Sequence, residues 1–301
     1  MNNCLLTIAI CTYNRQAFLE KALASVISQI ENIKNRKLEV LVVDNNSVDS
    51  TKVVVDKHLN NSCADIRYVV ERNQGLSHAR NCAVTHAKGK FIAFLDDDGY
   101  LCEGWLDSVI YECETNTYDI FGGVYLPSYD DGKETWFIDK YASNIHIDGE
   151  RRVLSEREYL SGGNICFNVS KVFNDLIFPT MIGMTGEKVA YGEEIFIQKL
   201  ARKKGLVIGY SPSMKIMHYT GLNKQKLSWQ LERLYAAGRD VWHTQGIKPT
   251  AYNIGKMMAK MFINPLIRLF RKSSYINHKV FIVEVYGPVI FCFSAIRNSR
   301  S

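Results

Sequence analysis

The sequence predicts an α/β fold, in which a sheet is covered by helices on both faces. Apolar runs typical of buried strands alternate with segments whose apolar residues recur at helical spacing. The runs are apolar throughout, as expected for strands of a sheet buried on both sides. This alternation favours right-handed βαβ units and a parallel sheet. The predicted strands are 5–11, 38–43, 66–70 and 91–95, and the predicted helices between them are 16–30, 50–59 and 76–87.

Charge divides the chain into two regions. The 301 residues are 47% hydrophobic, which is typical of a globular protein with a sizeable core. Residues 224–301 carry 13 Lys and Arg against 3 Asp and Glu, a net charge of +10. Residues 1–223 carry 24 against 28, a net charge of −4. We therefore expect an acidic body over 1–223 and a basic C-terminal region over 224–301, with different tasks.

The cysteines and the N-terminus suggest the compartment. None of the eight cysteines forms a C-x-x-C pair, so the sequence carries no zinc or redox motif of that type. The first residues lack the basic segment of a secretory signal. We expect a cytoplasmic protein, with a peripheral position on the inner face of the cell membrane as an extension of that prediction.

Polar residues follow each of the first four predicted strands. They are the turn 12–15, then Asp44, Arg72 and the run 96–98. Ligands of open α/β sheets bind at the carboxyl ends of the strands. These four polar turns are therefore expected to converge on one crevice.

The run Asp96-Asp97-Asp98 is a candidate metal site of the DXD type. Three neighbouring carboxylates repel one another, at roughly a kcal/mol for each close pair near the surface. A cation would neutralise them, and oxygen ligands suit Mg²⁺ or Mn²⁺, which in turn suit a diphosphate. The alternative is a solvated acidic turn beside a helix N-terminus near Glu103.

The sequence excludes two common nucleotide-binding motifs. It contains neither G-x-G-x-x-G after the first strand nor G-x-x-x-x-G-K-[ST]. A nucleotide could instead be held by Asp44 accepting hydrogen bonds from the base, and by Arg72 or Arg80 pairing with a phosphate. For Arg80 the alternative is a surface salt bridge on its helix.

Several motifs, in order and spacing, resemble those of family 2 glycosyltransferases. They are Thr12-Tyr13-Asn14-Arg15, Val42 to Ser47, Asn73-Gln74-Gly75 with Ala79-Arg80-Asn81, and Leu95 to Asp98. The resemblance covers residues 5 to about 220. It implies a GT-A fold with a Rossmann-type mixed sheet and flanking helices. It also implies a nucleotide-diphospho sugar donor, a divalent metal and inversion at the anomeric carbon.

The resemblance also implies roles for individual residues. Asp98 is the first choice for a metal ligand, with Asp96 and His218 as further ligands, although a lone His beside an apolar run is often structural. Gly162, Gly163 and Asn164 correspond to a segment lining the donor sugar and acceptor, or to an ordinary turn into a strand. The residues implied in nucleotide binding are Thr12, Tyr13, Asn14, Arg15, Asp44, Arg72, Asn73, Gly75, Arg80, Asp96 and Asp97.

A helix beginning at Tyr191-Gly192-Glu193-Glu194 offers a general base. The family usually has Glu-Asp at this place, so Glu-Glu keeps a carboxylate and leaves the choice of base between Glu193 and Glu194. We assign the base to Glu194 and expect the helix dipole to keep it ionised. The alternative is that acidic residues in a first helical turn serve only the helix.

The region after 224 is predicted to form amphipathic helices with interleaved Lys and Arg, as in helices that lie on anionic membranes. The alternative is packing on the catalytic domain or on another subunit. The apolar segment 280–296 contains Glu284, Gly287 and Pro288 and looks too short and interrupted to span a membrane. The polar segment 130–150 is expected to be a mobile loop over the site. No motif accompanies the basic charge that would indicate a nucleic-acid partner.

Together these features predict a metal-dependent, inverting glycosyltransferase of the bacterial polysaccharide type, using Mn²⁺ or Mg²⁺. It would move a sugar from a nucleotide-diphospho sugar to a hydroxyl of a glycan or lipid-linked acceptor. One alternative is a sugar-1-phosphate nucleotidyltransferase, which would need a Gly-rich, Arg-bearing loop after the first strand. Another is a non-catalytic module binding a nucleotide sugar or glycan at a membrane, against which the acidic run and Glu194 argue.

Overall fold

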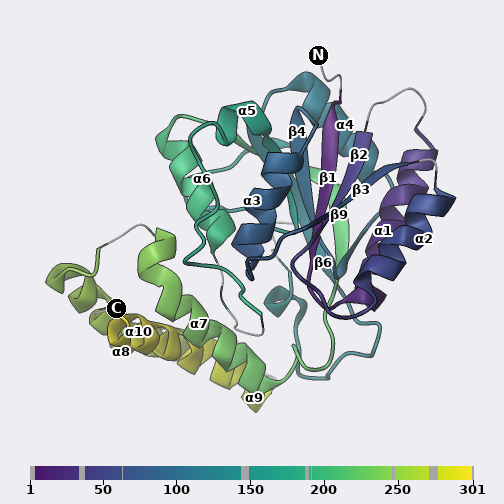
Figure 1. Cartoon of the computed structure of the whole chain (residues 1–301). Helices are drawn as coiled ribbons and strands as arrows, with labels where there is room; N and C mark the ends of the chain where they lie inside the picture. Colours follow the sequence, from purple (N-terminus) through teal and green to yellow (C-terminus); the bar gives the residue numbers. More distant parts are fainter. Residues whose placement is uncertain are drawn as a thin grey trace.

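A single nine-stranded sheet forms the centre of the molecule (Figure 1). The structure is a computed structural model that describes residues 4–33, 38–62, 64–143, 149–186, 190, 192–245, 248–270 and 277–299. Tyr191 of the predicted acidic turn and part of the 130–150 loop lie outside these residues. The strands are β1 (Leu6–Thr12), β2 (Leu38–Asp44), β3 (Asp65–Val70), β4 (Phe91–Asp96), β5 (Gly99–Leu101), β6 (Ile120–Ser128), β7 (Arg152–Val153), β8 (Asn164–Asn168) and β9 (Ile208–Tyr219).

The sheet is mixed, with the strand order β3-β2-β1-β4-β8-β6-β9-β5 and β7 beside β9. The first four strands pair in parallel, as the βαβ pattern predicts. Beyond them, β8 lies antiparallel between β4 and β6, while β9 is parallel to β6 and antiparallel to β5. The mixed sheet that the family resemblance implies is therefore confirmed, and the purely parallel arrangement holds only for the first four strands.

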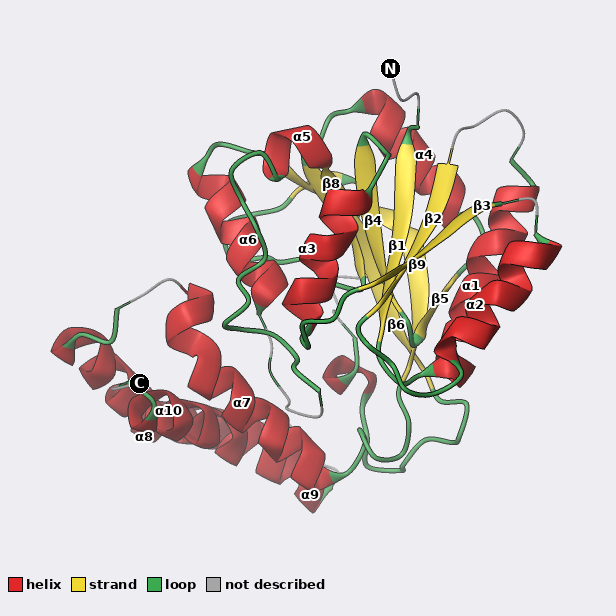
Figure 2. Cartoon of the chain, viewed as in Figure 1, coloured by secondary structure: helices red, strands yellow, loops and turns green. Residues whose placement is uncertain are grey.

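Helices cover both faces of the sheet (Figure 2). One face packs against α1 (Gln16–Glu31), α2 (Thr51–Asn61) and α4 (Trp105–Thr115), and the other against α3 (Leu76–His86), α5 (Val169–Val172) and α6 (Glu193–Lys203). Side chains along β1 point alternately to the two faces of the sheet. Ile8 and Ile10 belong to the core under α1, α2 and α4, and Ala9 belongs to the core under α3, α5 and α6. This two-sided burial explains why the central strands are apolar throughout.

The C-terminal region forms a separate helical layer beside the carboxyl ends of the parallel strands (Figure 1). Its helices are α7 (Leu227–Gln245), α8 (Ala251–Phe270), α9 (His278–Phe281) and α10 (Gly287–Arg297), with the π-helical turn η2 (Ile282–Tyr286) before α10. Trp242 of α7 donates from Nε1 to the carbonyl of Ala295, at 2.7 Å. Gly238 permits a close approach to α10, because a Cβ there would lie 2.1 Å from the carbonyl oxygen of Phe291.

The structure differs from two of our expectations in and near this layer. Segment 278–297 is continuously helical, because η2 changes the hydrogen-bond register ahead of Pro288; by length and composition it is the one helix among the described residues that could cross a membrane. The described part of segment 130–150 is not polar throughout: Trp136, Phe137 and Tyr141, the last in the short helix η1 (Asp139–Tyr141), are buried in one cluster with Val283.

Candidate active site

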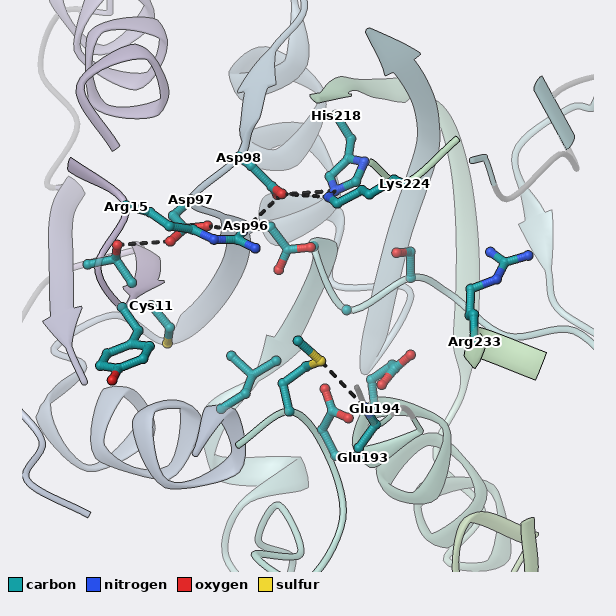
Figure 3. A pocket seen from close by; sticks show the side chains of 18 of the residues that line it. Cys11, Arg15, Asp96, Asp97, Asp98, Glu193, Glu194, His218, Lys224 and Arg233 are labelled. Carbon is teal, nitrogen blue, oxygen red and sulfur yellow. Dashed lines mark hydrogen bonds and ion pairs between the residues drawn. The ribbon is translucent and has the colours of Figure 1, made fainter. Parts of the chain in front are cut away.

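A cavity of about 470 Å³ opens at the carboxyl ends of the parallel strands. In Figure 3 the three aspartates, His218 and Lys224 lie on one side of it, and Glu193 and Glu194 lie on the opposite side. The polar turns of the first four strands thus contribute to one crevice, as the sequence predicts. The predicted site residues that line it are Thr12, Tyr13, Arg15, Gly75, Arg80, Asp96, Asp97, Asp98, Gly162, Gly163, Glu193, Glu194 and His218.

The acidic run is held by cationic side chains of the chain itself. Arg15 donates from Nη1 to Asp97 Oδ1 at 3.0 Å and to Asp98 Oδ2 at 2.9 Å. Lys224 Nζ lies 2.8 Å from Asp98 Oδ2, and Thr12 donates its hydroxyl to Asp97 at 2.8 Å. The repulsion expected from the sequence is therefore offset within the protein, by Arg15 of the acidic body and Lys224 of the basic C-terminal region.

Burial and ion pairing shift the pKa values of Asp97 and Asp98 in opposite directions. Burial raises the pKa of Asp97 to about 6, although Arg15 opposes the shift. Burial also disfavours the charge on Asp98, but attraction to His218 and Lys224 outweighs it and holds the pKa of Asp98 well below its ordinary value. Asp98 therefore stays ionised at acidic pH values at which Asp97 already takes up a proton.

Asp96, Asp98 and His218 fit a divalent cation. Each offers one ligand atom, and these atoms lie within 4.8 Å of one another. Nε2 of His218 lies 3.1 Å from Asp98 Oδ1, and its buried Nδ1 has no hydrogen-bond partner in the part of the chain that is described. Carboxylate oxygens suit Mg²⁺ or Mn²⁺, and an imidazole nitrogen is a common ligand of divalent transition metals. The donor set agrees with the metal ligands that the sequence resemblance implies.

Arg80 joins the acidic run to the acidic helix. Its guanidinium is buried. Nη1 lies 2.5 Å from Glu193 Oε1, and Nη2 lies 3.5 Å from Asp96 Oδ1. Gly162 makes room for this guanidinium, since a Cβ there would lie 2.6 Å from Nη2. Gly163 does the same for Asp96, whose Oδ2 would lie 2.2 Å from an added Cβ. A surface salt bridge for Arg80 is thus excluded, and the paired glycines approach side chains of the site itself.

Among the described residues, no cationic side chain forms an ion pair with Glu194. Burial, and then the neighbouring carboxylate of Glu193, raise its pKa to about 8 against the attraction of Arg80. This corrects the expectation that the helix dipole keeps Glu194 ionised, because desolvation at this position exceeds the effect of the helix terminus. A carboxylate with a pKa near neutral pH is suited to accept a proton from a hydroxyl.

Asp44 and Asn45 organise the turn on the other side of the pocket. Asp44 accepts from the hydroxyl of Tyr68 and from the backbone N–H of Ser47, at 2.8 Å for the latter. Asn45 lines the pocket, and its Oδ1 accepts a hydrogen bond from the backbone N–H of Gly75 at 2.7 Å. The φ angle of Gly75 is +140°. A side chain at Gly75 would be strained, so Asn45 and Gly75 together fix the shape of this wall.

Five predicted residues do not line the pocket: Asn14, Asp44, Arg72, Asn73 and Asn164. Asn164 departs furthest from the prediction: its side chain is fully buried, accepts from Trp105 Nε1 at 2.8 Å and donates to the carbonyls of Val124 and Met214. All its hydrogen-bonding groups are used, so it fixes the core rather than contacting a ligand. Arg72 and Asn73 are exposed on the turn after β3, and Asn14 accepts from the backbone N–H of Val48.

Several pocket residues were not predicted from the sequence. Lys224, Trp229, Gln230 and Arg233 belong to the basic C-terminal region, where charge and amphipathic spacing gave no sign of a place in the catalytic pocket. Tyr125 stacks on the His218 ring at 4.6 Å and donates to Asp96 at 3.2 Å. A tyrosine inside an apolar strand gave no sign of this role. Asn45 follows the predicted residue Asp44, but the sequence gave no separate reason to place Asn45 in the pocket.

This fold and site define a class of enzymes. A GT-A-like sheet carries an acidic run at its carboxyl edge and faces a second pair of carboxylates across the pocket, as in glycosyltransferases. The family model described as "Glycosyl transferase family 2" matches residues 7–173. The chain belongs to this family.

Individual relatives match less than half of the chain. A GalNAc(5)-diNAcBac-PP-undecaprenol beta-1,3-glucosyltransferase of Campylobacter jejuni is 36% identical over 119 residues, which are 39% of this chain and 37% of that protein. The UDP-Glc:alpha-D-GlcNAc-diphosphoundecaprenol beta-1,3-glucosyltransferase WfaP of Escherichia coli is 33% identical over 114 residues, 37% of this chain and 42% of that protein. The matches therefore span well under half of each relative.

Solved structures resemble the chain over nearly its whole length. The mannosyltransferase PcManGT of Pyrobaculum calidifontis, in complex with GDP-Man and Mn²⁺, superposes with a TM-score of 0.59 at 15% identity and covers 97% of this chain and 86% of its own. Residues 1–349 of Staphylococcus aureus TarS with UDP-GlcNAc give 0.52 at 15% identity, over 99% and 91% of the two chains. At this identity the likeness establishes the GT-A-like fold.

Proposed function

We propose that the chain is a metal-dependent, inverting glycosyltransferase that moves a sugar from a nucleotide-diphospho sugar to a hydroxyl of a lipid-linked glycan. The observation that carries the proposal is the opposition of two acidic sites across one cavity. Asp96, Asp98 and His218 can hold a cation on one side, and Glu194 faces them with its pKa raised to about 8. A donor bound between them would expose its anomeric carbon to an acceptor beside Glu194.

The side chains divide the work of transfer. Glu194 would take the proton of the acceptor hydroxyl as the bond to the anomeric carbon forms. Glu193 would orient Arg80, and the buried Arg80 would keep Asp96 in place. A metal held by Asp98, Asp96 and His218 would offset the charge on the leaving diphosphate. Arg15 and Lys224, which pair with Asp98 in this structure, would turn to the phosphates as the metal takes over that carboxylate.

Relatives support the choice of substrates. The relatives from Campylobacter jejuni and Escherichia coli are named for acceptors linked to undecaprenol through a diphosphate. The exposed apolar face of α8, beside Lys256 and Lys260, suits a helix lying on an anionic membrane. We therefore propose that transfer takes place at the inner surface of the cell membrane, with 1–223 as the catalytic domain and 224–301 as the membrane-associating region.

The proposal is tested by measuring thermal stabilisation with a panel of nucleotide sugars, with and without Mn²⁺. A donor at free concentration L that binds only the folded state stabilises it by RT ln(1 + L/Kd), so the melting temperature rises with the logarithm of donor concentration above Kd. We expect one donor class to stabilise the protein, and to do so only with the metal. Asp98→Asn should abolish that shift, while Arg72→Ala, on the exposed turn after β3, serves as the matched control. Equal shifts with and without metal would contradict metal dependence.

A further inference from the structure

A second cavity of about 490 Å³ lies among the helices of the C-terminal layer. Its apolar wall comes from three elements of that layer: α7, α8 and the η2–α10 segment. The apolar residues that line it are Leu234, Met257, Val283, Pro288, Phe291 and Cys292. A pocket with such a wall can hold a hydrocarbon chain.

The same cavity carries an excess of positive charge. Lys140, Arg233 and Lys260 line it, against the single carboxylate of Glu284. Lys140 pairs with that carboxylate at 2.8 Å, and Tyr141 donates its hydroxyl to it at 3.0 Å. Lys260 is exposed at this cavity, and Arg233 adds a second cation to its lining. A cavity that is apolar on one side and cationic on the other suits an amphiphile with a phosphate group.

The two cavities adjoin each other. Tyr141 and Arg233 line both of them, and Arg233 donates from Nη1 to the carbonyl of Tyr141 at 2.8 Å. Arg233 also lies over the ring of Trp229, a residue of the catalytic pocket, with 5.8 Å to the ring centroid. A molecule that reaches from one cavity to the other would therefore pass this arginine and tyrosine.

We propose that the second cavity binds the phosphate-bearing end of the lipid carrier to which the acceptor sugar is attached. This inference rests on the proposed function and extends it to the acceptor. The phosphate would lie at Lys260 and Arg233, the start of the apolar chain would follow the wall formed by residues such as Met257 and Phe291, and the sugar would enter the catalytic pocket. Bulk phospholipid is a poorer match, because nothing in its headgroup calls for a cavity that adjoins the catalytic pocket.

The face of α8 supports this occupant. Helical spacing brings Tyr252, Ile263 and Ile267 to one side of the helix, and all three side chains are exposed. Lys256 and Lys260 lie on the same broad face, and both are exposed. Lys260 lines the cavity, whereas Lys256 does not. An acceptor lipid could thus pass from the surrounding membrane into the cavity along α8.

Lys256 also provides a matched control for Lys260. Both substitutions to alanine remove one positive charge from α8, so they weaken attraction to an anionic membrane equally. The experiment measures binding of farnesyl monophosphate to the full chain by calorimetry, in a metal chelator so that metal-dependent binding at the aspartates is excluded. Farnesol and inorganic phosphate serve as probes that lack the anion or the chain.

We expect farnesyl monophosphate to bind the wild type more tightly than either partial probe. Lys260→Ala should weaken binding by roughly tenfold, the usual size of one hydrogen bond to a charged group. Lys256→Ala should leave binding unchanged, and Lys260→Arg should retain it. In transfer assays Lys260→Ala should raise the KM of a lipid-phosphate acceptor and leave the donor's thermal stabilisation intact.

Three results would overturn the assignment. Equal losses in Lys256→Ala and Lys260→Ala would indicate general attraction to anions along α8. Equal affinity for farnesol and farnesyl monophosphate would show that the cations take no part. Equal effects of Lys260→Ala on a lipid-phosphate acceptor and on the same sugar with a short neutral aglycone would indicate altered folding. A wild type that no nucleotide sugar stabilises would instead contradict the proposed function, which the donor assay reveals separately.

Discussion

The catalytic body and the C-terminal helical layer handle charge and apolar surface in different ways. In the body, Arg80, Asp97, Asp98 and Glu193 are each less than a tenth exposed, and all four are paired. In the layer, α8 exposes apolar side chains, with Phe262 at 64% and Leu266 at 55% of full exposure. Buried pairs hold side chains in the one geometry that chemistry needs, whereas an exposed apolar face is typical of a surface that meets another partner.

The two regions meet at the active site, which contains residues of both. Lys224 pairs with Asp98, and Trp229, Gln230 and Arg233 line the pocket. The basic region therefore contributes to the site as well as carrying the exposed apolar face of α8. Substitutions deep in the body should alter turnover and donor binding. Those on the outer face of α8 should alter only association with lipid.

The largest effect is expected from removing the general base. Glu194→Gln should lower transfer by about 10²–10⁴-fold while donor and metal binding stay near normal, because the side chain keeps its size and loses its basicity. Glu193→Gln should affect transfer less. It should lower the melting temperature more, because Arg80 then loses a buried carboxylate partner. Steady-state kinetics and thermal unfolding measure both.

The relative loss of transfer in these two variants shows which glutamate is the general base. A larger loss of transfer in Glu193→Gln would move the base to Glu193. Unchanged transfer in both would contradict the inverting mechanism, and the anomeric configuration of the product, read by NMR, would then separate inversion from retention.

A large effect on donor binding is expected at the metal site. Asp98→Ala should weaken Mn²⁺-dependent binding of a nucleoside diphosphate at least about tenfold to a hundredfold. The fold should persist, because Arg15 keeps its contact with Asp97 and the partly exposed Lys224 can turn to solvent. Calorimetry with and without Mn²⁺ measures this, and an unchanged affinity would exclude Asp98 as a ligand.

The pH dependence should follow Glu194. Because its pKa is raised to about 8 and the base must be ionised, transfer should rise with pH and level off above about 8. The sign for stability is opposite: the folded state binds this proton more tightly than the unfolded state, so stability from this group is present at acidic pH and declines as pH rises toward 8. Glu194→Gln should remove both trends. A pH profile that it leaves unchanged would assign them to another group.

A smaller effect is expected on the outer face of the layer. Phe262→Ser together with Leu266→Ser should reduce binding to anionic liposomes by about tenfold or more, since two exposed apolar side chains leave the contact. High salt should weaken binding of the wild type through screening. Val53→Ser on α2, which removes a side chain 67% exposed on the body, is the control. Equal losses of liposome binding in the α8 variant and in Val53→Ser would contradict a special role for the exposed face of α8.

The smallest effect is expected at Arg72. Its side chain is exposed and lies outside the pocket, so Arg72→Ala should change donor affinity by less than about threefold. Arg15→Ala, at the pocket wall, should weaken binding clearly in the same assay. A loss of tenfold or more in Arg72→Ala would mean that the turn after β3 closes on the donor, as the sequence resemblance implies.

Local pattern determined much of this protein. Apolar runs and helical spacing predicted the first four strands and their helices, and the positions of the strand ends then brought the polar turns to one edge. The acidic run was found from its position at a strand end, whereas the roles of the Glu-Glu turn and His218 were implied by the family resemblance. Strands and helices depend on residues a few positions apart, and periodicity reports them directly.

Partners that are distant in sequence were decided only by the tertiary structure. Arg80 meets Glu193 across 113 positions, and Lys224 meets Asp98 across 126. No period in the chain encodes such pairs, so Arg80 seemed free to bind a phosphate and Lys224 seemed only part of a basic region. Asn164 likewise resembled a ligand contact until β8 was inserted between β4 and β6, where its amide satisfies carbonyls of two other segments. A buried polar group takes whichever partners the packed fold brings to it, because leaving it unpaired costs more than any local preference.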